Sequence, residues 1–108
     1  MCKRSTAPQT TSTSKNASVA RLRKAQASVS SAEIERLEAI LDCERDEVWR
    51  ADDCRDLAQW LSLTLGFSQW HARRLINAAH SLPHLPKISA AFASGALGLD
   101  KVTELCRF

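Results

Sequence analysis

Histidine is the residue type in this sequence best suited to bind a metal or to act as a general base. The three histidines are His71, His80 and His84, and Pro83 interrupts any helix that would place the last two on one face. Residues 57–99 contain no acidic residue. A zinc site needs closely spaced ligands, and a catalytic nucleophile needs a base with an orienting acid. We therefore expect no catalytic residue, no metal site and no cofactor in this chain.

The four cysteines are scattered through the chain without the paired spacing of metal ligands. No secretory signal precedes them, so we interpret them as reduced thiols of a cytoplasmic protein. No stretch approaches the ~20 apolar residues of a membrane span, and no small-molecule site is evident. The cysteines are Cys2, Cys43, Cys54 and Cys106.

A different chemistry, contact with nucleic acid, is indicated by residues 58–76. Ser62 would let two helices cross closely, Gly66 would make a sharp turn between them, and Phe67 would lock the pair. This spacing is typical of a helix-turn-helix, although a structural hairpin in any small bundle has the same pattern. The second helix would present the following candidates for contact with bases or phosphates: Gln69, Trp70, His71, Arg73 and Arg74.

The faces of that second helix follow from its apolar residues. Ala72, Leu75, Ile76 and Ala79 would form the inner face, which places Arg74 toward the outside and Arg73 on a flank. We expect all three tryptophans to pack in the core. For the one at the helix start, stacking on a partner is the alternative. The tryptophans are Trp49, Trp60 and Trp70.

The elements that position these residues are predicted to be helices throughout, which makes the fold class all-α, a small helical bundle. Ser30 and Glu33 predict a capping box at the start of the first helix. Gly66 predicts a left-handed helix end, and Pro83 ends the following helix. The expected helices cover approximately residues 31–51, 54–65, 69–82, 86–94 and 101–108, with caps from Ser30, Asp53, Ser68 and Asp100.

Charge divides the chain into blocks. Residues 1–30 carry six basic and no acidic residues and few large aliphatic ones, so we expect a disordered basic tail. Residues 31–56 hold ten acidic and four basic residues, and residues 57–99 hold three basic ones. The blocks favour a polyanion such as DNA as partner, or self-association; simple solubility is the alternative. Residues 31–108 form a partial helical domain, and the stop at Phe108 in the middle of an apolar face predicts a truncation.

Several motifs carry a resemblance to a known family. They are VWRADDCRDLAQWL at 48–61, LGFS at 65–68 with ARRL at 72–75, and LPHLP at 82–86 with AAFASGALGLDKV at 90–102. The chain resembles the actinobacterial domain-of-unknown-function family 222 (13E12 repeat family), the N-terminal helical domain of HNH endonuclease-like proteins. One departure is Cys54, where relatives often have glycine or another small residue.

The resemblance implies full-length relatives that are endonucleases, in which a His–Asn–His set binds a divalent metal. None of those residues can be placed here, so this chain is not expected to be an enzyme. The favoured interpretation is a nucleic-acid-associated accessory module of an HNH-endonuclease-like protein that lacks the nuclease part. A helical protein-interaction or self-association module, or a non-functional gene fragment, is the alternative.

Overall fold

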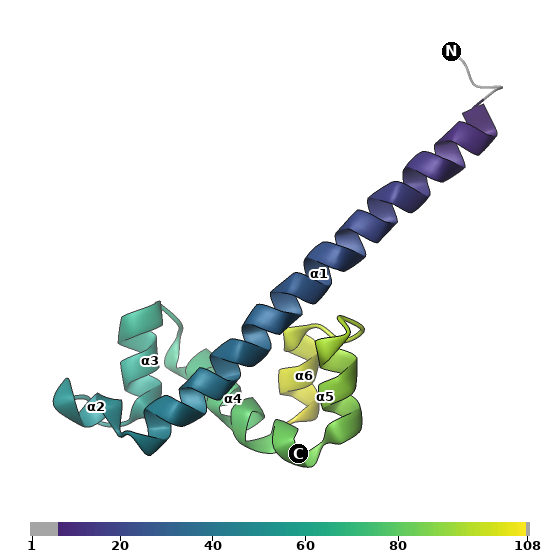
Figure 1. Cartoon of the computed structure of the whole chain (residues 1–108). Coiled ribbons are helices and arrows are strands. Elements are labelled where there is room, and N and C mark those ends of the chain that lie inside the picture. Colours follow the sequence, from purple (N-terminus) through teal and green to yellow (C-terminus); the bar gives the residue numbers. More distant parts are fainter. Residues whose placement is uncertain (1–6, 108) are drawn as a thin grey trace.

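The computed structural model describes residues 7–107, with side chains described from residue 14 onward. Every regular element in this part of the chain is helical, which confirms the predicted all-α class. The elements are α1 (Ala7–Arg45), α2 (Val48–Ala51), α3 (Leu57–Leu65), α4 (Gln69–Ser81), the 3₁₀ turn η1 (Leu82–His84), α5 (Pro86–Ala93) and α6 (Leu99–Leu105) (Figure 1).

The longest element, α1, leaves the bundle at its N-terminal end (Figure 1). A helix of 39 residues is about 58 Å long, which accounts for most of the 65 Å length of the molecule. The described side chains before residue 26 are all exposed, whereas Leu37 and Ile40 are buried. We refer to residues 7–25 as the arm.

The arm differs from the disordered tail predicted for residues 1–30. Residues 7–30 are helical, and residues 1–6 lie outside the described part. The segment buries little apolar surface, as its composition predicts, but helicity here does not depend on burial. The arm extends a helix already nucleated in the bundle, and Ala, Arg, Lys and Gln are good helix formers. The larger apolar side chains of the arm, Val19 and Leu22, are exposed. The side chain of Val29, just after the arm, is exposed as well.

The capping box predicted at Ser30 and Glu33 is wrong for the same reason. Ser30 lies inside α1, where its backbone is part of a continuous helix, and its side chain is fully buried with no hydrogen-bond partner for Oγ. At the other end, α1 stops at Arg45 rather than at the predicted residue 51. Glu47 adopts a left-handed conformation (φ 50°), which separates α1 from the short α2.

Local sequence accounts well for the α3–α4 hairpin. The Asp56 carboxylate caps α3 by accepting from the Gln59 backbone N–H at 2.8 Å, so α3 begins later than the predicted cap at Asp53. Gly66 ends α3 with φ 78°, and Ser68 Oγ caps α4 by accepting from the His71 backbone N–H at 3.0 Å. The left-handed Gly66 and the Ser68 cap confirm the prediction of a helix-turn-helix-like hairpin.

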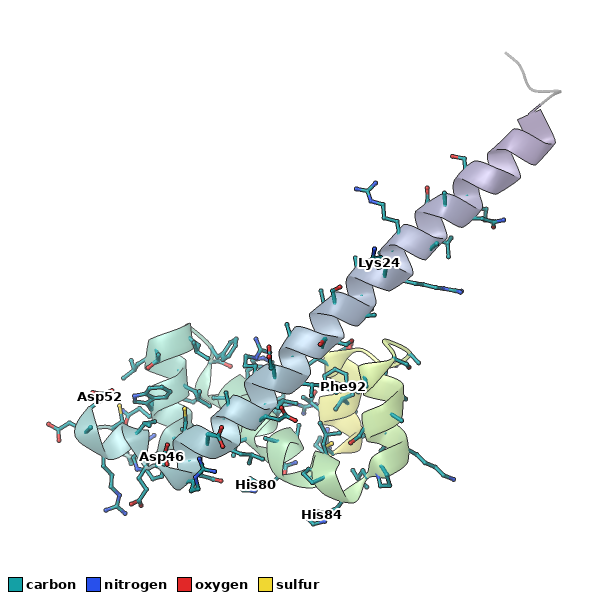
Figure 2. All side chains as sticks on the ribbon, in the orientation of Figure 1. Lys24, Asp46, Asp52, His80, His84 and Phe92 are labelled. Carbon is teal, nitrogen blue, oxygen red and sulfur yellow. The ribbon has the colours of Figure 1, made fainter. Side chains whose placement is uncertain are left out.

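The centre of the bundle is α4, which packs against α1, α3 and α6. Its buried face consists mostly of alanine, and such small side chains allow neighbouring helices to approach closely. Trp49 and Trp60 are only partly buried and pack against the edge of this core. The core side chains are Leu37, Ile40, Leu57, Ala58, Leu61, Ala72, Leu75, Ala78, Ala79, Phe92, Val102 and Cys106 (Figure 2 labels Phe92).

The turn between α5 and α6 lies directly against α1. Gly95 has φ 84°, and a Cβ on it would lie 3.4 Å from the backbone nitrogen of Ala27. The N-cap residue of α6 is Gly98 rather than the predicted Asp100. The carbonyl oxygen of Asp100 accepts from Thr103 Oγ1 at 2.9 Å. The contact between Gly95 and Ala27 marks the point where the bundle ends and the arm begins.

Candidate functional site

The exposed side of α4 carries Trp70, Arg73 and Asn77, which share one helix face at spacings of three and four residues. Trp70 is 65% exposed, so the predicted burial of all three tryptophans is wrong for this one. The reason is its position opposite the buried residues Leu75 and Ala79. α4 contains no acidic residue, so its exposed face is aromatic, polar and basic.

Arg73 and Gln69 form a small polar network with a residue that precedes α3. Gln69 Oε1 accepts from Arg55 Nη2 at 3.0 Å and from Arg73 Nη2 at 3.4 Å. Within the described residues, no carboxylate forms an ion pair with Arg73. Arg73 is therefore exposed and available to an anion, while Gln69 holds the two guanidinium groups together.

The carboxyl group nearest this network is Asp56. The backbone N–H of Gln59 lowers the pKa of Asp56 below its ordinary value, and the charges of Arg55 and Arg73 lower it further. Asp56 stays ionised near neutral pH and offsets part of the positive charge on this side of the hairpin. Its main role remains that of the helix cap.

Arg74 is placed differently from its neighbour. Its side chain is only 16% exposed, and Nη2 lies 3.1 Å from Glu104 Oε1 and 3.4 Å from Thr103 Oγ1. The guanidinium carbon lies 4.6 Å from the centre of the Trp70 ring, in a cation–π contact. The predicted positions of the two arginines are thus reversed, because α6 covers the flank on which Arg74 lies.

One shallow depression on this side of the molecule, which we call the α4 patch, is lined by Trp70, Arg73, Arg74, Asn77 and Arg107. Asn77 Nδ2 donates to the carbonyl of Cys106 at 2.7 Å, and Arg107 Nη1 lies 2.9 Å from Glu104 Oε2. Among the described side chains here, three arginines face one glutamate, which gives these side chains a net positive charge. An exposed tryptophan beside guanidinium groups can stack on a planar group while those groups bind an anion.

His71, the remaining predicted contact residue, does not line the α4 patch but an adjoining depression, together with Trp70 and Arg74. Its ring lies 4.9 Å from that of Phe67 in an edge-to-face contact, and Arg36 of α1 stacks over the same Phe67 ring at 5.3 Å. His71 is half-buried. The structure therefore brings Arg73 and Arg74 together at the patch, places Gln69 at its edge, and gives His71 a packing role at the hairpin turn.

The residues considered for metal binding or nucleophilic chemistry lie apart. In the described part of the chain, no group of three or more His, Cys, Asp or Glu residues could hold a metal ion. His80 Nε2 lies 2.7 Å from Glu44 Oε1 of α1 (Figure 2). Cys43, Cys54 and Cys106 are free thiols, and burial raises the pKa of Cys106, which keeps this thiol protonated.

Comparison with known families identifies the chain. The sequence model of the family described as "Domain of unknown function (DUF222)" matches residues 14–108. The chain belongs to this family. No match came from the curated proteins or from the solved structures.

The DUF222 match includes every residue of the α4 patch. It begins at residue 14, inside the segment predicted as a tail, so it includes the described side chains of the arm as well. No helix in the described part of this DUF222 chain combines the length and the apolar character needed to cross a membrane.

Two members of the patch were missed from the sequence: Asn77 and Arg107. Asn77 shares a helix face with Trp70 and Arg73, so the helical spacing could have identified it. Arg107 comes from beyond the end of another helix, and no signal in the sequence places it beside α4. The same holds for Arg55, whose contact with Gln69 depends on how the hairpin folds.

Proposed function

We propose that this chain is a nucleic-acid-associated module that contacts the phosphate backbone through the α4 patch. The observation that carries the proposal is the combination of exposed Trp70 and three arginines at the second helix of a helix-turn-helix-like hairpin. In such hairpins the exposed face of the second helix is the one that docks on DNA. Arginine suits phosphate because its planar group donates two parallel hydrogen bonds.

The residues have distinct roles in this proposal. Arg73 contacts phosphate, and Trp70 stacks on a base or a sugar. Arg74 is a positioning residue, because its bonds to α6 hold the Trp70 ring in place. The arm adds exposed basic side chains that attract a polyanion without sequence preference: Lys15, Arg21, Arg23 and Lys24.

The resemblance stated from the sequence extends the proposal. We infer that the parent protein is HNH-endonuclease-like, and that this chain supplies an accessory module without the nuclease part. No catalytic role is assigned to any residue here. The module would bring the parent protein to DNA through backbone contacts, which supply most of the affinity of non-specific binding.

The test is a fluorescence-anisotropy titration of the full chain against a labelled duplex at several salt concentrations. Arg73→Ala should weaken binding and reduce the slope of log affinity against log salt by about one, since one phosphate contact is lost. Lys87→Ala is the matched control, because Lys87 is an exposed basic residue on α5, outside the patch. It should leave the affinity much closer to that of the parent chain.

Two results would overturn the proposal. One is the absence of binding by the parent chain even at low salt. The other is an equal loss of affinity in Arg73→Ala and Lys87→Ala, which would mean that only net charge matters.

A further inference from the structure

One side of α1 is uncovered along the whole helix. In Figure 1 the helix crosses the front of the bundle, and the other helices lie behind and beside its C-terminal half. The side chains on this outer face recur at alternating spacings of three and four residues, which keeps them on one stripe. They are Arg21, Lys24, Ser28, Ser31, Glu35 and Glu38, and all are exposed.

The order of charges along this outer face is its distinguishing property. Two basic residues come first, two serines lie in the middle, and two acidic residues follow. Within the described residues none of the four charged groups takes part in an ion pair. The bundle therefore leaves both halves of the stripe without compensation.

A second α1 laid antiparallel against the first matches this order. With Ser28 opposite Ser31 of the other copy, Lys24 falls opposite Glu35 and Arg21 falls opposite Glu38. A two-fold axis between the serines makes each pair occur twice, and such an arrangement closes on itself. A parallel pair would instead place like charges side by side.

We infer that the outer face of α1 binds a second copy of this chain as an antiparallel helix pair. The serines at the centre let the two helices approach closely, and the paired stretch from residue 21 to residue 38 is about 27 Å long. Because the bundle packs on the other side of α1, the two bundles lie on opposite sides of the pair. The interaction does not depend on the α4 patch or on nucleic acid.

The electrostatics make self-association sensitive to salt. Exposed ion pairs are individually weak and are screened at high ionic strength, so the dimer forms best at low salt and at high protein concentration. Sedimentation velocity of the full chain, without nucleic acid, should show a monomer–dimer equilibrium that shifts toward monomer as salt is added.

Charge reversal tests the register directly. Lys24→Glu brings two carboxylates together at the pair of positions 24 and 35, and Glu35→Lys brings two ammonium groups together there. Each variant alone should therefore associate at least about tenfold more weakly. The double variant Lys24→Glu with Glu35→Lys should regain the dimer. An equimolar mixture of the two single variants should also dimerise, because every pair is then attractive.

Arg23→Glu is the matched control. It makes the same change in net charge on the same arm, but Arg23 lies on the side of α1 next to the α5–α6 turn. It should not change the association, and circular dichroism checks that each variant remains helical. The inference is overturned if the parent chain stays monomeric at low salt, if neither the double variant nor the mixture recovers the dimer, or if Arg23→Glu is as disruptive as Lys24→Glu.

Discussion

Two neighbouring arginines on α4 show how strongly one step along a helix changes the surroundings of a side chain. Adjacent helical residues differ by about 100° in direction. Arg73 therefore faces solvent and donates a hydrogen bond to Gln69, while Arg74 lies between Trp70 and Glu104. An alanine scan of the pair should be interpreted with this difference in mind. Loss of Arg74 removes a link between α4 and α6, and loss of Arg73 removes an exposed charge.

Asp56 allows a test of helix capping at the residue scale. Asp56→Ala should lower the free energy of unfolding by about 1 kcal/mol at pH 7, because a free backbone N–H of α3 loses its acceptor. Asp56→Asn should be much milder, since asparagine also caps. Urea titrations monitored by circular dichroism measure both.

The pKa of Asp56 adds a dependence on pH. The pKa of Asp56 is lower in the folded chain than in the unfolded chain, where it is about 3.9. The ionised carboxylate therefore stabilises the fold at pH values above about 3.9, and this stabilisation is lost as the pH falls through the pKa of the folded chain. The difference between the parent chain and Asp56→Asn should therefore shrink when the titration is repeated in acid. A difference that grows in acid would contradict this account.

At the scale of elements, the α3–α4 hairpin depends on the left-handed residue between its helices. Gly66 has φ 78°, and a Cβ on it would meet no heavy atom of the described residues within 4 Å apart from its own and its chain neighbours' atoms. Gly66→Ala should thus destabilise the fold by about 1–2 kcal/mol through backbone strain alone, without a steric clash.

Gly66→Asn provides the comparison. Asparagine tolerates the left-handed region better than alanine does, so this variant should lose less stability in the same thermal or urea unfolding experiment. Equal losses in the two variants would indicate that the turn does not require this backbone conformation.

Helix ends that depend on local residues could be predicted from the sequence, and those that depend on packing could not. The end of α3 at Gly66 and the start of α4 at Ser68 depend on residues at those positions, and both were predicted correctly. The start of α1 was missed, because a helix that continues from a packed segment needs no local signal. The link from Arg74 to Glu104 spans thirty residues of sequence and follows only from the packing of α6 on α4.

At the scale of the whole molecule, the arm makes the chain elongated. The radius of gyration is 19.4 Å, against about 13 Å for a compact domain of this length. The helical content and the free energy of unfolding should therefore depend on different parts of this protein. The arm contributes helix, while the core that holds the fold together lies almost entirely after residue 26.

Removal of residues 1–20 tests that separation. The total helical signal per molecule in circular dichroism should fall, because residues 7–20 are helical, but the free energy of unfolding should change by no more than about 0.5 kcal/mol, since the described side chains of this segment are exposed. An unchanged total helical signal per molecule would contradict the helical arm. A large loss of stability would show that the arm packs on the rest of the chain.

The uninterrupted passage of α1 from the bundle into the arm has a geometric consequence for changes in length. The arm has no hinge, so its azimuth around the helix axis is fixed by the bundle. Insertion of one residue near Ala25 would rotate everything before it by about 100° and shift it by about 1.5 Å. Insertion of seven residues would restore the original azimuth to within about 20°. Any partner that binds the arm and the bundle together would thus accept insertions of two full turns far better than insertions of one or two residues.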